Sequence, residues 1–413
     1  MTYRPTLMGT KGMIATEHYL SAEAGMRILR AGGNAFDAAV AAALAEGVLN
    51  PHMHTFGGEL SALAYSAADK KVFSINGNTV APKAATIEWC QQHDITLLPF
   101  NGVISAGPCA APDAYLSVLQ RLGTCSFTQV VEPALELAQE GFPMHAALRG
   151  PAPEYLNIDF SIAGNAERFQ KHWPSSAKIY LPGGRLPDVG QVFTNPDLAR
   201  TFRRLITAEE QCTGDRIGSL KAVRAAFYEG EIGKGMVDYL GDSSLLSMED
   251  LRSYSVVERT PLQSDVFGKK LFTNPSPSVG GLLISFFLNL LTRNYRDTEI
   301  TPDLIVKTMA TVSRARFDGY KDPDNEYQLD SLLREDTLSH YSSMLNNLSI
   351  NKILDFSSKG LGSTTHVSII DKDGNAASVT TTNGEGCGYI LPGTGIMLNN
   401  MLGEEDLNPL GFH

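Results

Sequence analysis

The residues of this chain best suited to covalent chemistry are threonines on two short segments. Residues 364–371 (TTHVSIID) and 376–382 (AASVTTT) are rich in β-branched side chains, which favour extended structure. Asp373 and Gly374, which lie between them, are typical of a two-residue hairpin turn. The pattern therefore predicts an antiparallel hairpin with hydroxyl groups from both strands gathered at its open end.

The register of this hairpin decides which hydroxyl groups meet. A turn at Asp373–Gly374 places Thr364 beside Asn383 and one step from Thr382, and a longer loop shifts the register by one residue. Either arrangement brings a hydroxyl that can act as a nucleophile close to hydroxyls that can position it. Threonine pairs are also common on plain sheet edges, so the hairpin alone leaves that structural interpretation open.

Small and flexible residues flank the predicted hairpin and favour a functional site. The preceding residues 357–363 (SSKGLGS) are small and glycine-rich, as expected for a strained or cleavable connection. The following residues 384–388 (GEGCG), 392–395 (PGTG) and 399–400 (NN) combine flexible backbone with amide side chains. We expect these segments to surround a small ligand.

Composition and charge exclude several classes of protein. The chain has 413 residues, of which 43% are hydrophobic and 19% charged, as in globular folds. Its net charge of −11 argues against nucleic acid as a partner, because phosphate neutralisation needs surplus Lys and Arg. The start has no apolar run of signal-peptide length, and the apolar residues 282–291 are too few to span a bilayer. We expect a cytoplasmic protein with no membrane partner.

The cysteines give no sign of a disulfide framework or a metal site. The chain has five of them, an odd number, and they are scattered without CxxC spacing. This usage is typical of free thiols in a reducing compartment. We expect no metal and no cofactor.

Several predicted elements surround the hairpin and must position it. Their periodicity and capping residues predict helices at residues 21–31, 35–47 and 282–291, and strands at residues 59–66, 71–76 and 264–273. The helix at 35–47 has small residues on all faces, which predicts an interior position. No linker clearly divides the chain, so we expect a single domain over residues 1–413 with a long helical insertion.

A series of motifs runs through the chain in a fixed order. The earlier ones are AGGNAFDAAVAAA (31–43), the glycines of PHMHTFGG (57–58), AP (81–82), GPCAAPDA (107–114), PALELAQEGF (133–142) and PSPSVGG (275–281). The densest are TTH (364–366), DKDGN (371–375), GTGIMLNN (393–400) and EEDLNP (404–409). In type and order they resemble the gamma-glutamyltransferase (gamma-glutamyl transpeptidase) family of N-terminal-nucleophile hydrolases, over nearly the whole chain.

The resemblance implies an α+β fold, a four-layer αββα sandwich of the N-terminal-nucleophile hydrolase type with a largely helical insertion. Family members are made as one chain that cuts itself just before a threonine, and the matching bond here is Ser363–Thr364. Residues 1–363 then resemble the large subunit and residues 364–413 the start of the small subunit, with the family's C-terminal strands missing. We expect a heterodimer of the self-cleaved halves.

The resemblance also implies acyl transfer by Thr364. Cleavage frees an α-amine with a pKa of about 7.7–8.0, which is partly neutral near pH 7 and can take the hydroxyl proton. By analogy, Thr382 positions or activates the Thr364 hydroxyl, and water or an amine resolves the acyl-enzyme. The expected substrates are gamma-glutamyl or related small amides, such as glutathione.

Histidines near the predicted nucleophile receive structural roles. His366 follows the nucleophile, and we expect it to be structural or to help maturation. His52 and His54 could be read as bases in an exposed loop. Because Thr364 supplies its own base, we expect them to be packing residues of the loop.

The predicted substrate-binding positions depart from the family pattern. An arginine that grips the substrate α-carboxylate in the family is matched here by Asn78, which brings no positive charge. A family asparagine falls on Gly384, with Asn383 adjacent. Glu404 and Glu405 lie near the family's acidic pair, and Glu404 could meet a substrate ammonium group. We therefore expect retained catalytic threonines with an altered glutamyl clamp, which also suits glutaryl-type and small oxo-acid amides.

Two further classes of function stay open. A catalytically inactive homologue or fragment would bind a small amide or amino acid without turning it over, and the missing arginine favours it. A phosphate-binding enzyme using residues 274–281 (NPSPSVGG) is disfavoured, because this loop has two prolines and no Lys beside its glycines.

Overall fold

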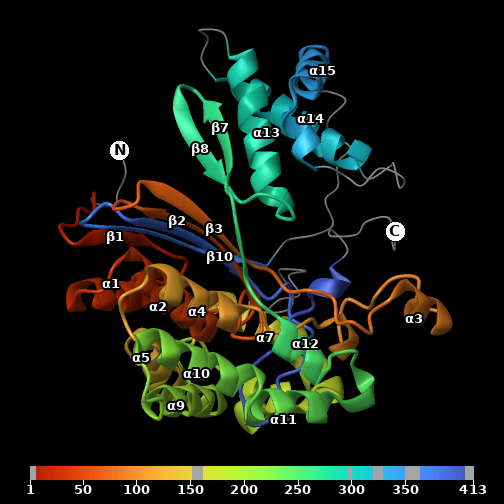
Figure 1. Cartoon of the computed structure of the whole chain (residues 1–413). Helices are drawn as coiled ribbons and strands as arrows, with labels where there is room; N and C mark the ends of the chain where they lie inside the picture. The colour runs from red at the N-terminus through yellow and green to blue at the C-terminus, as the bar shows by residue number, and fades with distance from the viewer. Residues whose placement is uncertain (1–5, 151–160, 296–299, 320–328, 349–362, 405–413) are drawn as a thin grey trace. The chain divides into compact units, whose positions relative to one another are not determined.

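The computed structural model describes residues 6–150, 161–295, 300–319, 329–348 and 363–404, and it has an α+β architecture (Figure 1). Its main element is a six-stranded sheet in the order β1-β9-β10-β2-β3-β6. The strands are β1 Gly12–Ala15, β9 Thr365–Asp371, β10 Ala376–Thr382, β2 Glu59–Ser66, β3 Lys71–Gly77 and β6 Val257–Arg259. β9 pairs antiparallel with β1 and β10, and β10 pairs antiparallel with β2. The predicted hairpin is confirmed and lies inside the sheet, not at its edge.

Three helices, α1, α2 and α4, pack against strands of this sheet. The helices of this part of the chain are α1 Tyr19–Ala31, α2 Ala35–Leu49, α3 Ile87–Gln92, α4 Ala111–Leu122, α5 Phe127–Glu140, α6 Ala146–Arg149, α7 Ile162–His172, α8 Pro174–Tyr180, α9 Pro196–Glu210, α10 Arg216–Tyr228, α11 Glu231–Leu240 and α12 Met248–Ser253. Figure 1 shows α1, α2 and α4 beneath the sheet, with α5, α9 and α10 in a further layer. A short pair of strands, β4 Phe142–Pro143 and β5 Val192–Phe193, lies outside the main sheet.

Helix α2 is the interior helix that the sequence predicts. Every one of its residues is buried, and it contacts β9 and β10 directly. Its alanines let neighbouring elements approach closely on all sides. Asn34 and Asp37 form a capping box at its start, which satisfies the backbone N–H groups of the first turn.

The loop of the β9–β10 hairpin is longer than the predicted two-residue turn. Four residues connect the strands, and the register pairs Thr381 with Thr365. One step further, Thr364 lies opposite Thr382 and not opposite Asn383. Because directly opposed side chains lie on the same face of a sheet, this register brings the two predicted catalytic threonines together.

The carboxylate of Asp371 fixes this loop. Its Oδ1 accepts hydrogen bonds from the N–H groups of Asp373 and Asn375, both at 2.9 Å. Its Oδ2 accepts from Asn375 Nδ2 and from the N–H of Ala35, the first residue of α2, also at 2.9 Å. Burial works against the charge, but the hydrogen bonds hold the pKa of Asp371 below its usual value. Asp371 thus sets the hairpin register and joins the hairpin to α2.

The chain forms two compact units, of which the first comprises residues 1–71, 75–257 and 361–412. The second unit comprises residues 72–74, 258–360 and 413. Its elements are β7 Leu262–Val266, β8 Lys269–Thr273, α13 Val279–Asn294, α14 Pro302–Gly319 and α15 Glu335–Asn346. The expectation of a single domain over residues 1–413 stays a prediction.

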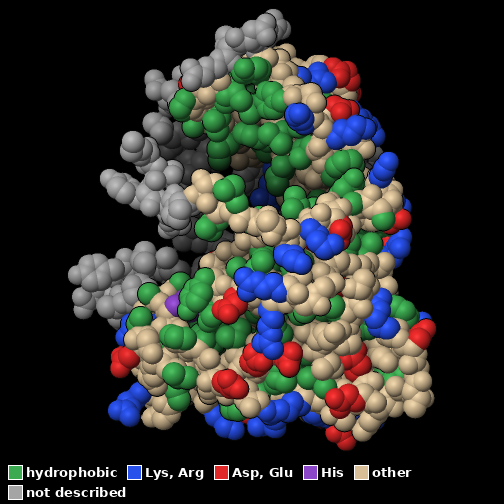
Figure 2. All heavy atoms as spheres, turned by 90° about the vertical axis from the view of Figure 1, so that its left-hand side faces the viewer, with side chains coloured by type: hydrophobic (Ala, Val, Ile, Leu, Met, Phe, Trp, Pro, Cys, Tyr) green, Lys and Arg blue, Asp and Glu red, His purple; other side chains and the backbone are tan. Residues whose placement is uncertain are grey.

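The second unit contains a correction to the sequence analysis. Residues 264–273 do not form one strand, because Phe267 and Gly268 adopt positive φ angles of 48° and 72° and turn the chain between β7 and β8. The helix predicted at residues 282–291 is confirmed as part of α13. Figure 2 shows hydrophobic side chains gathered over this unit. Two of the exposed hydrophobic residues of the unit are Ile284 and Met309, which are 53% and 57% exposed. Within the described ranges, no helix is long and apolar enough to cross a bilayer.

We expect Asp371→Asn to lower the free energy of unfolding by about 2 kcal/mol at pH 7, because an amide replaces a charged acceptor of four hydrogen bonds. The depressed pKa means that this advantage of the wild type is present above a pH of about 3.9 and is lost as the pH falls through the folded-state pKa. Chemical denaturation of both proteins at pH 7 and at pH 3 measures the difference in unfolding free energy and its dependence on pH. The exposed Asp373→Asn serves as the control, and an equal loss at both pH values contradicts the prediction.

Candidate active site

Three polar side chains form a row at the open end of the hairpin. Thr364 lies opposite Thr382 by the register of β9 and β10, and Thr382 pairs with Glu59 of β2. Directly opposed residues lie on one face, so the row Thr364–Thr382–Glu59 crosses three neighbouring strands. Thr364 is exposed, Thr382 is half-buried and Glu59 is buried. The row therefore brings together the exposed hydroxyl of Thr364, the half-buried hydroxyl of Thr382 and the buried carboxyl group of Glu59.

The hydroxyl of Thr382 acts on the peptide bond that the sequence analysis predicts to be cleaved. Its Oγ1 donates to the carbonyl oxygen of Ser363 at 2.6 Å. Thr382 Oγ1 in turn accepts a hydrogen bond from the N–H of Gly384 at 3.1 Å. This bond orients the hydroxyl so that its proton points toward the carbonyl oxygen of Ser363. The geometry therefore polarises the carbonyl of the Ser363–Thr364 bond. The predicted role of Thr382, to position or activate the Thr364 hydroxyl, stays a prediction.

Ser363 is anchored from its other side by a loop. Its Oγ donates to the carbonyl oxygen of His52 at 2.5 Å and lies 3.2 Å from the Sδ atom of Met53. The side chain is buried, whereas the next residue, Thr364, is exposed. The predicted cleavage site is thus held at the carbonyl and at the serine side chain, with the nucleophile left accessible.

The histidines of this loop have properties that suit packing. Burial lowers the pKa of both His52 and His54 to about 3, with a further contribution from His145 at His52. His54 is fully buried, and its Nε2 lies 2.5 Å from the hydroxyl of Tyr115. Both rings are neutral at physiological pH, in keeping with the predicted structural role.

His366 lies on the same face as the threonine row, one pair further along the hairpin. Its Nδ1 lies 2.8 Å from Thr380 Oγ1, and its Nε2 lies 3.1 Å from Ser368 Oγ and 3.2 Å from Ser378 Oγ. Burial lowers its pKa. The ring therefore connects hydroxyls of both strands beside the site.

Glu59 is a buried carboxyl group held by neutral donors. Its Oε1 accepts from Asn78 Nδ2 at 2.9 Å and its Oε2 accepts from the N–H of Thr79 at 2.8 Å. Burial raises its pKa to about 7; the two hydrogen bonds oppose this, and the nearby charge of Glu404 adds to it. Among the described residues, no Lys or Arg forms an ion pair with it. The side chain of Asn78 is thus a hydrogen-bond donor to Glu59 in this structure.

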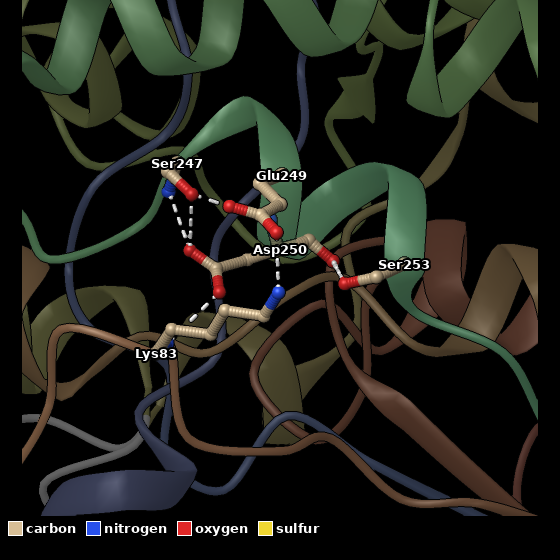
Figure 3. Close-up of polar contacts among 5 residues, drawn as sticks. All are labelled: Lys83, Ser247, Glu249, Asp250 and Ser253. Carbon is tan, nitrogen blue, oxygen red and sulfur yellow. Dashed lines mark hydrogen bonds and ion pairs between the residues drawn. The ribbon is translucent and has the colours of Figure 1, made fainter.

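The segment that carries Asn78 is fixed by α12. The N–H of Lys83 donates to Asp250 Oδ1 at 2.9 Å, and Lys83 Nζ contacts Glu249 Oε1 at 2.5 Å (Figure 3). Tyr254, just after the helix, donates its hydroxyl to the carbonyl oxygen of Asn78 at 2.9 Å. These contacts hold Asn78 and Thr79 against Glu59.

Gly384 is required by close packing beside Thr382. Its φ is 61°, and a Cβ atom would lie 2.1 Å from Asn400 Oδ1 and 2.4 Å from Glu404 Oε1. Glu404 Oε1 therefore lies close to Gly384, and its predicted role at a substrate ammonium group stays a prediction. Glu405 lies outside the described residues, so its predicted role stays a prediction.

Asn383, predicted to contact substrate, and Asn399, predicted to lie near a small ligand, are fully buried. Asn383 accepts from Thr55 Oγ1 at 3.0 Å and donates to the carbonyl oxygen of Leu398 at 3.3 Å. Asn399 donates to the carbonyl oxygens of Gly57 and Gly107, at 2.9 Å and 3.2 Å. These amides support the site by joining distant segments. The predicted contact of Asn383 with substrate stays a prediction.

Glu59 is the residue of this site that sequence reasoning missed. The alternation over residues 59–66 correctly predicted a strand and treated Glu59 as its first residue. The available signal was a charged residue directly after Gly57–Gly58, where the chain enters a half-buried strand. Its position beside Thr382 depends on the pairing of β2 with β10, which the sequence does not give.

A cavity borders the site on the side of His52. It is lined by His52, Asn101, Arg168, Trp173 and Glu385, among others. His52 also accepts the hydrogen bond from Ser363, so the cavity and the cleavage site share this residue. Within the described parts of the chain, no group of His, Cys, Asp and Glu is placed to hold a metal ion.

Comparison with known proteins points to one family. The model of the family described as gamma-glutamyltranspeptidase matches residues 21–409. The glutathione hydrolase proenzyme of Bacillus subtilis (strain 168) is 28% identical, over 99% of this chain and 71% of that protein. The acylase ACY 1 proenzyme of Pseudomonas sp. (strain SE83) is 29% identical, over 97% of this chain and 71% of that protein.

Solved structures show the same fold. Cephalosporin acylase from Bacillus halodurans superposes with a TM-score of 0.79 at 24% identity, covering all of this chain and 74% of that one. The gamma-glutamyltranspeptidase of Helicobacter pylori gives a TM-score of 0.71 at 21% identity, covering 86% of this chain and 99% of that one. The expected α+β fold of the N-terminal-nucleophile hydrolases is thereby confirmed.

We expect Glu59→Gln to alter how stability depends on pH. A carboxyl group whose pKa is raised by burial stabilises the folded chain below its unfolded-state pKa and loses that advantage as the pH rises toward 7. The stability of the variant relative to the wild type should therefore rise between pH 5 and pH 8, by on the order of 3 kcal/mol. Denaturation curves of both proteins at several pH values measure it, and parallel pH profiles would contradict it.

Proposed function

Since the chain belongs to the gamma-glutamyltranspeptidase family, a family of enzymes, we propose that it is a self-processing amide hydrolase or acyltransferase. It cleaves its own Ser363–Thr364 bond and then uses Thr364 as an N-terminal nucleophile. Its substrates are gamma-glutamyl or related small amides, such as glutathione, and water or an amine accepts the acyl group. The names of its relatives, a glutathione hydrolase and an acylase, support this range.

The observation that carries the proposal is the 2.6 Å hydrogen bond from Thr382 Oγ1 to the carbonyl oxygen of Ser363. A hydroxyl donor at this oxygen stabilises the negative charge that develops when a nucleophile attacks the carbonyl carbon. The Oγ1 atom of Thr364 belongs to the residue on the amine side of the same bond. The arrangement therefore suits attack of Thr364 on the peptide bond that precedes it.

Self-cleavage then proceeds in two balanced steps. In the first, Thr364 Oγ1 bonds to the carbonyl carbon of Ser363, the C–N bond breaks, and the hydroxyl proton passes to the amine of Thr364. In the second, water hydrolyses the resulting ester, which leaves a carboxylate on Ser363 and a free hydroxyl and amine on Thr364. The new amine can serve as the base that takes the proton from its own hydroxyl in each later turnover.

Thr382 has a second role in the mature enzyme under this proposal. Once Ser363 is no longer joined to Thr364, the Thr382 hydroxyl is free to interact with the nucleophile that lies opposite it. The N–H of Gly384 keeps this hydroxyl oriented, because it occupies one of its acceptor positions at 3.1 Å. One residue thus first polarises the bond to be cut and then positions the nucleophile.

We expect the purified full-length protein to separate into two fragments on a denaturing gel, the smaller beginning Thr-Thr-His-Val. Thr364→Ala should abolish the split. Thr382→Val, which keeps the shape but removes the hydroxyl, should slow cleavage by about 10²–10³-fold, the usual loss for one such donor. Thr382→Ser keeps the donor and serves as the matched control, with near-normal cleavage.

A single uncut band from protein that hydrolyses gamma-glutamyl amides overturns the self-processing proposal. Uncut protein that binds a small amide or amino acid without turnover supports the non-catalytic homologue instead. Equal cleavage rates in Thr382→Val and the wild type remove the role given to the Thr382 hydroxyl.

A further inference from the structure

We propose that Glu59 determines the charge preference of the acyl-donor site. The site selects donors with an ammonium group about three carbons from the scissile carbonyl over donors that carry only a carboxylate there. The inference rests on the proposed function, because it takes Thr364 as the nucleophile. It names the substrate class that the altered clamp accepts.

The first step is the distance between Glu59 and the nucleophile. Thr364, directly before β9, lies opposite Thr382 of β10, which pairs with Glu59 of β2, and the three side chains face the same side. Since neighbouring strands are about 4.8 Å apart, the Cα atoms of Thr364 and Glu59 lie about 10 Å apart. A donor whose carbonyl carbon is at Thr364 Oγ1 can extend over Thr382 and bring a group three carbons away to the carboxyl group of Glu59.

The second step is the charge around Glu59. Its two oxygens accept from an amide and a backbone N–H, at 2.9 Å and 2.8 Å, and each oxygen can accept one more hydrogen bond. The charge acting on it is that of Glu404, another carboxylate, and no described Lys or Arg pairs with it. A buried carboxylate without a cation destabilises the folded protein. A substrate ammonium group would supply the positive charge that the protein does not place beside Glu59.

The same charges act against an anionic donor group. A carboxylate placed between Thr364 and Glu59 would face both Glu59 and Glu404, with Asn78 as a neutral neighbour. Two like charges at close range in a buried site repel each other strongly. Glu59 therefore favours one donor class and disfavours the other through a single charge.

A purely structural role for Glu59 makes a different prediction. In that case Glu59 only anchors Asn78 and Thr79, and its loss affects every donor alike. Glu59→Gln keeps the size of the side chain and an oxygen that can accept one of these hydrogen bonds, but it removes the charge. A change that depends on the charge of the donor distinguishes selection from anchoring.

The test uses the full-length protein and three p-nitroanilide donors that differ only at the third carbon from the carbonyl. 4-Aminobutyryl carries an ammonium group there, glutaryl a carboxylate, and γ-glutamyl both. We expect the wild type to have a kcat/KM for the 4-aminobutyryl donor at least ~10-fold above that for the glutaryl donor, the scale of a lost charged contact. Glu59→Gln should lower kcat/KM for the 4-aminobutyryl donor at least ~10-fold and raise kcat/KM for the glutaryl donor.

Glu88→Gln is the matched control, because it removes the same negative charge from an exposed position on α3. It should leave the ratio of the two kcat/KM values at the wild-type level. A wild-type preference for the glutaryl donor overturns the inference. So does an equal loss for all three donors in Glu59→Gln, which assigns Glu59 to anchoring.

A binding measurement keeps the inference separate from the proposed function. If the protein turns over none of the donors, calorimetric titration with 4-aminobutanamide and with glutaramate still tests the charge preference. Tighter binding of the ammonium ligand that is lost in Glu59→Gln supports the inference while the proposed function fails. Binding of neither ligand, or tighter binding of glutaramate, overturns it. Turnover without charge preference leaves the proposed function standing and overturns the inference alone.

Discussion

The arrangement of the site depends on the register of the β9–β10 hairpin. Asp371 fixes that register at one end, where its carboxylate accepts hydrogen bonds from the loop and from the first residue of α2. At the other end the same register places Thr364 opposite Thr382. A slip of one residue would turn every side chain of β9 to the opposite face of the sheet and bury the threonine that has to be exposed.

The surroundings of the hairpin are built to hold one peptide bond still. The carbonyl of Ser363 accepts from Thr382, and its side chain donates to the loop at His52. Behind this loop, buried asparagines join segments that are far apart in the sequence, as Asn399 does between Gly57 and Gly107. Such fully satisfied amides support a rigid site because any displacement leaves buried polar groups unpaired.

The charge of the site is set by the carboxyl groups of Glu59 and Glu404 and by the lack, among the described residues, of a Lys or Arg paired with Glu59. Glu59 is buried with an amide and a backbone N–H as its partners, and the charge of Glu404 raises its pKa further. A protein that keeps such a group retains a destabilising element at a site that already carries a candidate nucleophile. This cost links specificity to stability in one residue.

The sequence by itself determined the local elements and the family. The β-branched runs predicted β9 and β10, the small residues of α2 predicted its interior position, and the ordered motifs identified the gamma-glutamyltranspeptidase relationship. Local patterns suffice for these features, because backbone preference and hydrophobic periodicity act within a few residues. Only the tertiary structure decided the hairpin register, the target of the Thr382 hydroxyl and the position of Glu59. Each of these depends on hydrogen bonds between segments remote in the sequence, and one residue of register changes which side chains meet.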